Sequence, residues 1–307
     1  MVKKFFYKSA LFLLISIGIC LVIQQALAPC IRDTNTYMAA SIDKEHRLKT
    51  LPAPRIIFVG GSNLTFGLDS KTVSDHFNLP VVNMSLHGGL GLYYMLDETI
   101  SQVKKGDVII LSIEYYLQAK GEQKLQAQLL DVNQHAAPYI IHTLNDRIRF
   151  EIIDWQRCVS GFFLKYVLRK KDNYFKRSDF AENGDLIGYL NKPQPAHQIG
   201  RGERQPEDYS ESFRAMNSFI KEAERKGAHV LFAFPNFPAS EYILSQKAIE
   251  QYEKQAQSML ICPIINTPKT FLMKDEDLFD SVYHLNKTGR KKRTDLMIAV
   301  LDKYIKV

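Results

Sequence analysis

Residues 56–63 read Ile-Ile-Phe-Val-Gly-Gly-Ser-Asn, and this stretch decides the fold that the sequence predicts. Four apolar residues in a row are typical of a strand that is buried on both faces of a sheet. The two glycines that follow lack a Cβ, so the backbone can bend sharply as it leaves the strand. The turn is therefore expected to present the hydroxyl of Ser62 at the carboxyl edge of the sheet, where open α/β folds bind their ligands.

Strand and helix patterns alternate on both sides of that turn. Leu92, Leu96 and Ile100 repeat at helical spacing between two short apolar segments, and helical spacing recurs after Ser210 and from Lys287. Such alternation predicts parallel strands joined by helical crossovers. We therefore expect an α/β fold, a three-layer sandwich with a mostly parallel central sheet. The expected strands are 56–59, 80–83, 108–111, 229–234 and 260–265.

The alternation breaks between about 117 and 205. The stretch from Asp146 to Lys170 predicts a long amphipathic helix that carries Trp155, and polar, turn-rich segments follow it. We interpret 117–205 as an insertion into the α/β domain. It could form a lid or docking surface over the carboxyl edge of the sheet, or it could add packing helices that have no direct role.

The first thirty residues predict a membrane anchor. Lys3, Lys4 and Lys8 precede a run from Ala10 to Ala28 that contains no charged residue. About twenty apolar residues cross a bilayer as a helix. Basic residues that flank such a helix stay on the cytoplasmic side, so we expect residues from about 30 onward to lie outside the cytoplasm.

This anchor sets the expected domain organisation. We expect an anchor or uncleaved signal over 1–29, a stem over 30–52 and an extracytoplasmic α/β domain over 53–307. A signal peptide that is cleaved after Ala26-Leu27-Ala28 is the alternative, although Pro29 disfavours cleavage there. Both alternatives put the α/β domain in the same compartment.

A late segment supplies the partners that a nucleophilic serine needs. Asp280 and His284 lie four residues apart near the end of the chain. An imidazole can take the proton of a serine hydroxyl, and a carboxylate can hold that imidazole in the required tautomer. We therefore expect Ser62, His284 and Asp280 to form a catalytic triad, with Asp277 or Asp275 as an alternative to Asp280.

Four segments in this order resemble the blocks of the SGNH (GDSL-type) hydrolase superfamily, especially its membrane-anchored bacterial members that act on the cell envelope. They are Gly60-Gly61-Ser62-Asn63, Asn83-Met84-Ser85-Leu86-His87-Gly88, Ser112-Ile113-Glu114-Tyr115 and Asp280-Ser281-Val282-Tyr283-His284. The resemblance implies a flavodoxin-like sandwich in which Ser62 is the nucleophile. It also implies that the backbone N–H groups of Ser62 and Gly88 bind the oxyanion. Asp280 precedes His284 by four residues, one more than in the family.

Position 114 departs further from the family pattern. Glu114 stands where the resemblance implies an asparagine, whose amide is a third oxyanion donor. An ionised carboxylate accepts hydrogen bonds and cannot donate one. Either Asn63 or Asn83 supplies the missing amide, or Glu114 is protonated, or the site is impaired. Glu114, Asn83 and His87 are also candidates for substrate contact, although His87 suits a structural turn equally well.

Composition bears on partners and cofactors. The chain has 40 Lys+Arg against 33 Asp+Glu, a net charge of +7, and its basic runs either face solvent or attract anionic lipid or polymer. The compartment and the lack of an aromatic–basic surface argue against nucleic acid as a partner. No Cys or His spacing is typical of a metal site, so we expect no metal and no other cofactor. One disulfide can form among Cys30, Cys158 and Cys262, but the spacing does not choose the pair.

These features predict an extracytoplasmic serine acyl-esterase or O-acyltransferase. Its substrate would be acyl esters, acetyl esters foremost, of a cell-surface glycan or envelope polymer. The anchor would hold the site beside lipid-linked substrate or beside a membrane protein that donates acyl groups. Two alternatives stay open. One is a lipase or general esterase whose acyl pocket uses Phe162 and Phe163, and the other is a catalytically impaired binding or assembly factor, which Glu114 favours.

Overall fold

The computed structural model describes residues 2–115, 117, 119–169, 175–195, 200 and 202–306. Its centre is a four-stranded parallel sheet with the strand order β2-β1-β3-β4. The strands are β1 (Ile56–Gly60), β2 (Val81–Asn83), β3 (Val108–Ser112) and β4 (His229–Phe232). The predicted α/β class and the parallel sheet are confirmed.

The strand order creates a topological switch point between β1 and β3. After β1 the chain adds β2 on one side, and it then returns to add β3 on the other side. Gly60, the last residue of β1, pairs with Ser112, the last residue of β3. The turns that follow these two strands therefore open at the same point of the carboxyl edge, where open α/β sheets bind ligands.

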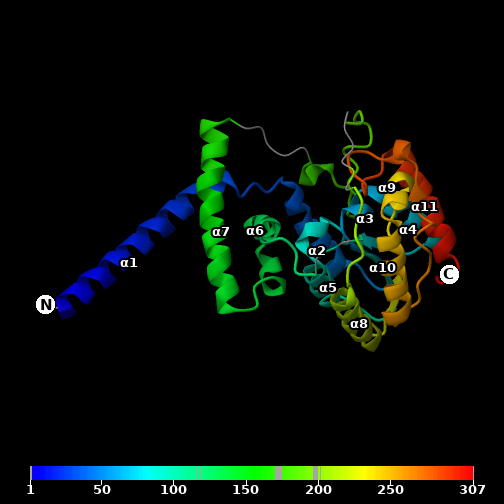
Figure 1. Ribbon diagram of the computed structural model, residues 1–307, viewed down its shortest axis with the longest axis horizontal. Coiled ribbons are helices and arrows are strands. Elements are labelled where there is room, and N and C mark those ends of the chain that lie inside the picture. The colour runs from blue at the N-terminus through cyan, green and yellow to red at the C-terminus, as the bar shows by residue number, and fades with distance from the viewer. Residues whose placement is uncertain are drawn as a thin grey trace.

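Helices cover both faces of the sheet and make three layers (Figure 1). One face, which includes Ile57 and Ile109, packs against α2, α5, α8 and α10. The other face, which includes Phe58 and Ile110, packs against α3, α4 and α11. Successive strand residues enter opposite cores because strand side chains alternate between the two faces. The helices are α2 (Ala40–Thr50), α3 (Ser62–Gly67), α4 (Ser70–Phe77), α5 (Leu92–Ile100), α8 (Ser210–Arg225), α10 (Gln246–Met259) and α11 (Lys287–Leu301).

The predicted insertion divides into two parts. In the first part, α6 (Gln123–Val132) and the 3₁₀ segment Gln134–Tyr139 lead to α7 (Leu144–Phe162), which continues as a π-helical turn over Phe163–Val167. These helices lie at the end of the body that faces α1 (Figure 1). The second part, around Asp185 and Tyr189, bonds to α3 and α4 beneath the carboxyl edge of the sheet. Residues 118, 170–174, 196–199 and 201 of the insertion lie outside the described residues.

The N-terminal helix α1 (Val2–Leu27) projects away from the body (Figure 1). With the 3₁₀ turn Ala28–Cys30 it is the one helix in the described part of the chain that is long and apolar enough to cross a membrane. Its side chains are largely exposed, with Gln24 as a buried exception. A signal sequence has the same length and composition, so the helix alone does not distinguish an anchor from a signal.

Three sequence predictions need correction or completion. Residues 260–265 do not form a strand: Ile264 makes only an isolated bridge to Phe232, and the neighbouring Pro263 has no N–H to donate to a ladder. The helix expected to reach Lys170 ends as an α-helix at Phe162, and Lys170 lies outside the described residues. All four cysteines are free thiols.

Short elements complete the fold: η2 (Tyr37–Ala39), η3 (Gly88–Leu90), η6 (Arg177–Asp179), β5 (Phe237–Pro238), α9 (Ala239–Leu244), β6 (Leu272–Met273) and η7 (Asp275–Asp277).

Candidate active site at the carboxyl edge of the sheet

Ser62 is the first residue of α3, directly after the turn that ends β1. Gly61 precedes it in an extended conformation, and the chain then enters the helix at once. Ser62 is half-buried, whereas Gly61 and Asn63 on either side of it are buried. The strand and the short helix therefore fix the serine hydroxyl at the carboxyl edge, as the sequence predicts.

Glu114 reaches this serine from the turn after β3. Its Oε1 accepts a hydrogen bond from Ser62 Oγ at 3.0 Å and another from the backbone N–H of Asn63 at 2.8 Å. The side chain of Glu114 is itself nearly buried. Glu114 is therefore the acceptor in both hydrogen bonds, and it fixes the direction in which the hydroxyl of Ser62 points.

Two glycines make room for this carboxylate. A Cβ on Gly61 would lie 2.4 Å from Glu114 Oε2, and a Cβ on Gly88 would lie 2.1 Å from the same oxygen. Contacts this short are steric clashes, so any side chain at either position would displace Glu114. The carboxylate therefore fills the space beside Gly88, whose N–H the resemblance assigns to the oxyanion.

Arg293 lies beneath the serine turn and is completely buried. Its Nη1 donates to the backbone oxygen of Asn63, and its Nη2 lies 3.3 Å from Ser112 Oγ. Burial lowers the pKa of Arg293 to about 9, and the negative charge of Glu114 opposes that shift. The guanidinium thus joins the first turn of α3 to the end of β3 and supplies positive charge near the carboxylate of Glu114.

His284 and Asp280 form a close pair on the loop that precedes α11. Asp280 Oδ1 lies 2.6 Å from His284 Nδ1. A carboxylate only accepts hydrogen bonds, so this contact assigns the proton of the neutral imidazole to Nδ1 and leaves the lone pair on Nε2. That tautomer is the one in which Nε2 can take a proton from a serine.

Phe66 brings the imidazole to the serine helix. The rings of Phe66 and His284 stack with centroids 3.6 Å apart and planes 3° from parallel. Phe66 follows Ser62 by four residues on α3, and residues at this spacing have Cβ atoms about 5–6 Å apart on one helix face. The imidazole therefore lies against the same helix face as the serine, about one turn away.

Two tyrosines tie the His284 loop to the strand ends. Tyr189 Oη lies 2.6 Å from the carbonyl oxygen of Phe66 and 2.5 Å from that of Leu285, and these two acceptors share its one proton. Tyr283 Oη donates to the carbonyl oxygen of Tyr115 at 3.1 Å. The loop is thus bonded on one side to the serine helix and on the other to the residue after Glu114.

The three predicted triad residues gather at one edge of the sheet, but the serine is bonded elsewhere. Among residues 2–115, 117, 119–169, 175–195, 200 and 202–306, no hydrogen bond joins Ser62 to His284. The serine hydroxyl points to Glu114, and the imidazole is held by Asp280. The arrangement supplies a nucleophile and an oriented base that meet only if the serine hydroxyl turns away from Glu114.

The alternative carboxylates lie elsewhere. Asp277 accepts from Lys292 Nζ at 2.7 and 3.0 Å, and Asp275 accepts from Ser240 Oγ at 2.6 Å. Neither of these contacts involves the imidazole. Of the three candidates, Asp280 is the one that contacts His284.

The other candidate residues have structural contacts of their own. The side-chain amide of Asn83 donates to Leu64 and Asp185, and that of Asn63 donates to Ser112. His87 Nδ1 accepts from the backbone N–H of Gly89 at the start of η3. Both asparagine amides are therefore used in hydrogen bonds that hold the turns after β1 and β2, and neither donates into the space that Glu114 fills.

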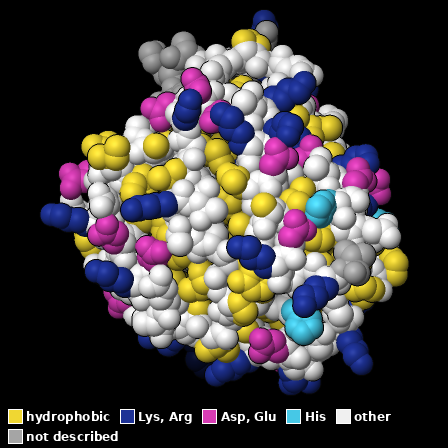
Figure 2. Space-filling model, turned by 90° about the vertical axis from the view of Figure 1, so that its right-hand side faces the viewer, with side chains coloured by type: hydrophobic (Ala, Val, Ile, Leu, Met, Phe, Trp, Pro, Cys, Tyr) yellow, Lys and Arg dark blue, Asp and Glu magenta, His cyan; other side chains and the backbone are white. Residues whose placement is uncertain are grey.

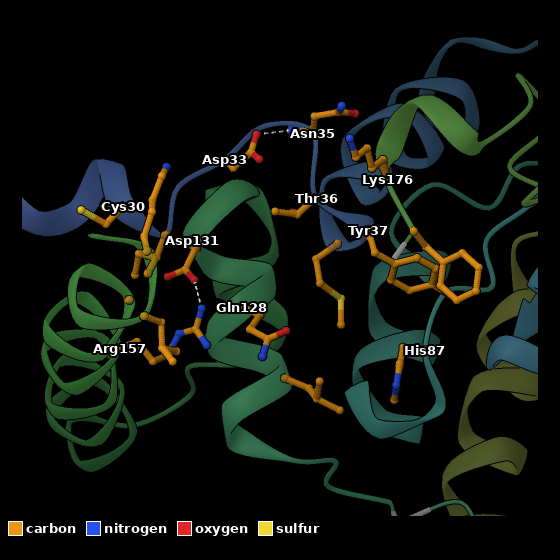
Figure 3. Close-up of a pocket in the computed structure, with 17 residues that line it drawn as sticks. Cys30, Asp33, Asn35, Thr36, Tyr37, His87, Gln128, Asp131, Arg157 and Lys176 are labelled. Atoms are coloured by element: carbon orange, nitrogen blue, oxygen red, sulfur yellow. Dashed lines mark hydrogen bonds and ion pairs between the residues drawn. The ribbon is translucent and has the colours of Figure 1, made fainter. Parts of the chain in front are cut away.

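A pocket of about 560 Å³ lies on the outer side of the turn that carries His87 and Gly88, and neither Ser62 nor His284 lines it (Figure 3). His87 and Tyr37 line one end, and Cys30 and Arg157 line the other. Tyr37 Oη donates to the carbonyl oxygen of Leu86 at 2.6 Å, two residues before Gly88. The pocket therefore extends from the turn that carries Gly88 to the end of α1, and its volume suits a small organic ligand.

Phe162 and Phe163 do not line this pocket. Both side chains are exposed near the end of α7, while Leu164 and Lys165 reach the pocket wall. In the part of the chain that the structure describes, no group of three or more His, Cys, Asp or Glu side chains is arranged to hold a metal ion. The described pocket is therefore mixed in character, with charged side chains beside apolar ones.

Sequence reasoning missed Arg293 and Tyr189. Arg293 belongs to a basic run that reads as a solvated face, yet Arg290 and Arg293 are buried. Their spacing of three residues, which places both on one side of a helix, is the signal that could have revealed them. Tyr189 lies in the insertion, and no motif marks it.

Comparison of the chain with known protein families finds no family model that matches it. A comparison with curated proteins finds no significant match either.

Proposed function

We propose that this protein is an extracytoplasmic serine acyl-esterase or O-acyltransferase. Its nucleophile would be Ser62, its base His284 and the orienting carboxylate Asp280. The observation that carries the proposal is the Asp280–His284 pair, which stacks on Phe66 one helical turn from the serine. A base with a free Nε2 at the same sheet edge as a serine is the minimum that acyl transfer requires.

The proposed reaction has two halves. His284 Nε2 takes the proton of Ser62 as its Oγ attacks the carbonyl carbon of an ester, and the proton then passes to the departing alcohol. This leaves an acyl group on Ser62. In the second half, water or a sugar hydroxyl gives its proton to Nε2 and takes the acyl group, and Nε2 then returns that proton to Ser62 Oγ as the serine leaves. Acid–base help of this kind is worth about 10²–10⁴-fold in rate.

Glu114 would define the resting state of this site. Its carboxylate fills the space beside Gly61 and Gly88 that the carbonyl oxygen of a substrate would need. A negative oxygen at that place repels the developing oxyanion. The carboxylate would therefore leave, or take up a proton, when substrate binds, and the hydroxyl of Ser62 would turn towards His284.

The location and the pocket support an envelope substrate. The apolar helix α1 suits a membrane anchor, and the pocket reaches from its end to His87, next to Gly88. The resemblance to membrane-anchored SGNH proteins suggests acyl, foremost acetyl, esters of a cell-surface glycan or envelope polymer. A membrane protein that donates acyl groups would be a natural partner for the transferase form. A general esterase or lipase shares the same first half-reaction.

The contact between Ser62 and Glu114 favours a second candidate function. A serine whose hydroxyl is held by a carboxylate at 3.0 Å is not poised to react. If Glu114 never leaves, the fold serves as an anchored binding or assembly factor for the same class of polymer. The two candidates differ in whether Ser62 ever reacts.

Labelling with a fluorophosphonate probe distinguishes them. The full chain in detergent micelles or nanodiscs is treated with the probe, and the modified residue is identified by mass spectrometry. We expect labelling of Ser62 in the wild type, none at this position in Ser62→Ala, and a rate lower by about 10²–10⁴-fold in His284→Ala. His135→Ala is the matched control, because His135 is exposed and pairs with Glu45 away from the site.

A folded wild-type protein that never reacts would favour the binding factor. If labelling succeeds, acetyl-ester hydrolysis measured with and without a glycan acceptor separates the esterase from the transferase. Transfer predicts an acetylated acceptor, whereas hydrolysis predicts free acetate in both assays.

A further inference from the structure

The outer face of α7 carries an apolar stripe that no described part of the chain covers. Its members are exposed side chains that recur at helical spacing along α7 and into the π-helical turn: Leu144, Ile148, Ile152, Trp155, Phe162 and Phe163. Leu144 is 74% exposed, and Ile148 and Ile152 are each more than half exposed. A row of large apolar side chains in water is unfavourable, and such a patch marks an interaction surface.

The opposite face of α7 holds the helix on the body. Phe150 is buried in the main core, with Ile153 packed against it. Arg157 pairs with Asp131 of α6, and Cys158 is fully buried. These residues fall on the helix side opposite to Ile148 and Ile152 or next to it, so the stripe points away from the protein body.

The helix α1 leaves the body at the same place. Gln24 near its end bonds to Asp154 of α7, and Ile31 just beyond α1 packs on Gly161. Figure 1 shows α7 at the end of the body that α1 leaves, running across the line of α1 instead of along it. The stripe and the apolar surface of α1 therefore lie at the same end of the molecule.

Charge at this end suits an anionic surface. Arg147, Arg149 and Lys165 are exposed on α7 and the turn that follows it. Of the three carboxylates of the helix, Asp146 accepts from the hydroxyl of the N-cap residue Thr143, and Asp154 lies 3.6 Å from Arg32. Glu151 is exposed and accepts from Gln24 at 3.5 Å. On the opposite end of the molecule, basic and acidic side chains are interspersed (Figure 2). An amphipathic helix with apolar and basic residues is typical of one that lies in a membrane interface.

We propose that α7 lies in the surface of the bilayer that α1 crosses, with its apolar stripe among the lipid acyl chains and its basic residues at the headgroups. The inference rests on the proposed membrane anchoring and not on the proposed chemistry. With α7 in the interface, the pocket that α6 and α7 border would open close to the membrane surface. Two contacts with the bilayer instead of one would also fix the orientation of the Ser62 site.

Trp155 allows a direct test, because it is the one tryptophan of the chain and a member of the stripe. The full-length protein is reconstituted in nanodiscs that contain phosphatidylglycerol, and its tryptophan emission is measured. Lipids brominated on their acyl chains quench only a tryptophan that contacts those chains. We expect a blue-shifted emission and a fall in intensity of at least two-fold with brominated lipid.

Matched variants locate the contact. Ile148→Glu with Ile152→Glu should restore at least half of the quenched emission, because charges on the stripe resist burial in lipid. As a negative control, Trp155→Phe with Ile243→Trp moves the probe to an exposed apolar position on α9, at the far end of the molecule, and quenching should vanish. Ser62→Ala should leave quenching unchanged, so a failure of the proposed chemistry does not affect this result.

Three outcomes would overturn the proposal. Wild-type emission at the wavelength of a water-exposed tryptophan would show that the stripe does not enter the bilayer. A blue-shifted emission without quenching would show that protein, such as a second copy or another membrane protein, covers the stripe. Equal quenching in the wild type and in the double glutamate variant would show that proximity of α1 alone accounts for the signal.

Discussion

Two loops at the carboxyl edge of the sheet each bring a carboxylate to the catalytic candidates, and they do opposite things. On the loop before α11, Asp280 holds the imidazole of His284 at 2.6 Å. On the loop after β3, Glu114 holds the hydroxyl of Ser62 at 3.0 Å. The first contact prepares a base, and the second occupies the nucleophile that this base would activate.

The difference shows that position, and not charge alone, decides what a carboxylate does beside a serine. Asp280 lies behind the imidazole, where negative charge stabilises the imidazolium that forms during reaction. Glu114 lies between Gly61 and Gly88, where the developing oxyanion would be. In the proposed enzyme one loop would therefore promote acyl transfer, while the other would restrain it until substrate arrives.

The largest expected effect concerns the promoting carboxylate. Asp280→Asn should lower the rate of probe labelling and of acetyl-ester hydrolysis by about 10²–10⁴-fold, because the amide no longer selects the tautomer with a free Nε2. Labelling kinetics followed by mass spectrometry measure this. The matched control is Asp277→Asn, since Asp277 bonds to Lys292 instead of the imidazole. Equal rates for the two variants would mean that Asp280 does not orient the base.

Removing the charge of Glu114, the carboxylate that holds Ser62, should raise the rate of probe labelling instead of lowering it. Glu114→Gln keeps the shape of the side chain, removes its charge and provides an N–H donor. We expect the rate of labelling to rise by about 10–100-fold. This is less than the factor of about 10²–10³ in rate that a well-placed oxyanion donor contributes. Glu122→Gln, on the exposed start of the segment before α6, is the control. A slower reaction of Glu114→Gln would show that the carboxylate assists catalysis, and the comparison between the loops would fail.

A double-mutant cycle tests whether Glu114 occupies the space beside Gly88. Gly88→Ala would place a Cβ 2.1 Å from Glu114 Oε2, so it should lower the free energy of unfolding by about 1–3 kcal/mol. In a Glu114→Ala background the same change should cost markedly less, because the clashing atoms are gone. Denaturant unfolding of the four proteins in one detergent gives the coupling. If the effects of Gly88→Ala and Glu114→Ala on the free energy of unfolding are additive, Glu114 does not occupy the space beside Gly88.

The smallest expected effect concerns Glu98, a carboxylate away from the site, and the dependence of stability on pH. Burial raises the pKa of Glu98 on α5 to about 8, from an ordinary value of 4.5. The folded state therefore keeps this proton at pH values where the unfolded chain has lost it, so the stability of the wild type falls as the pH rises from about 4.5 and levels off above about 8. Glu98→Gln should gain stability relative to the wild type between pH 7 and pH 9, by about 1 kcal/mol or about 2–4 °C in Tm. Thermal unfolding at both pH values measures this, and a constant difference would contradict the assignment.

The sequence was sufficient to predict the strands that are apolar throughout and the turn that carries Ser62. Ile56 to Val59 and Val108 to Leu111 can be recognised because a strand buried on both faces leaves a continuous apolar run. The 260–265 segment looks similar, but Pro263 and the edge position leave only a bridge. Local apolar composition therefore marks the segment that lies beside β4, and the missing N–H of Pro263 limits its pairing to one bridge.

The residues of the candidate site could be proposed from the sequence, but their hydrogen bonds could not. Ser62, Asp280 and His284 could be proposed because their chemistry depends on residue type. That Glu114 would accept the serine hydroxyl depends on the register of β1 against β3, which pairs Gly60 with Ser112 and sets the two turns face to face. The buried position of Arg293 depends on how α11 packs on α3. The spacing of Arg290 and Arg293 indicates a shared helix face, and the packing of that face decides its burial.

The most direct test of the central claim is a crystal structure of the protein after reaction with a small phosphonate ester. The account predicts a phosphonyl group on Ser62 Oγ, with one of its oxygens between Gly61 and Gly88, Glu114 moved out of that space and His284 Nε2 within hydrogen-bonding distance of the adduct. An unmodified Ser62 that is still bonded to Glu114, after the probe has reacted elsewhere or not at all, would contradict it.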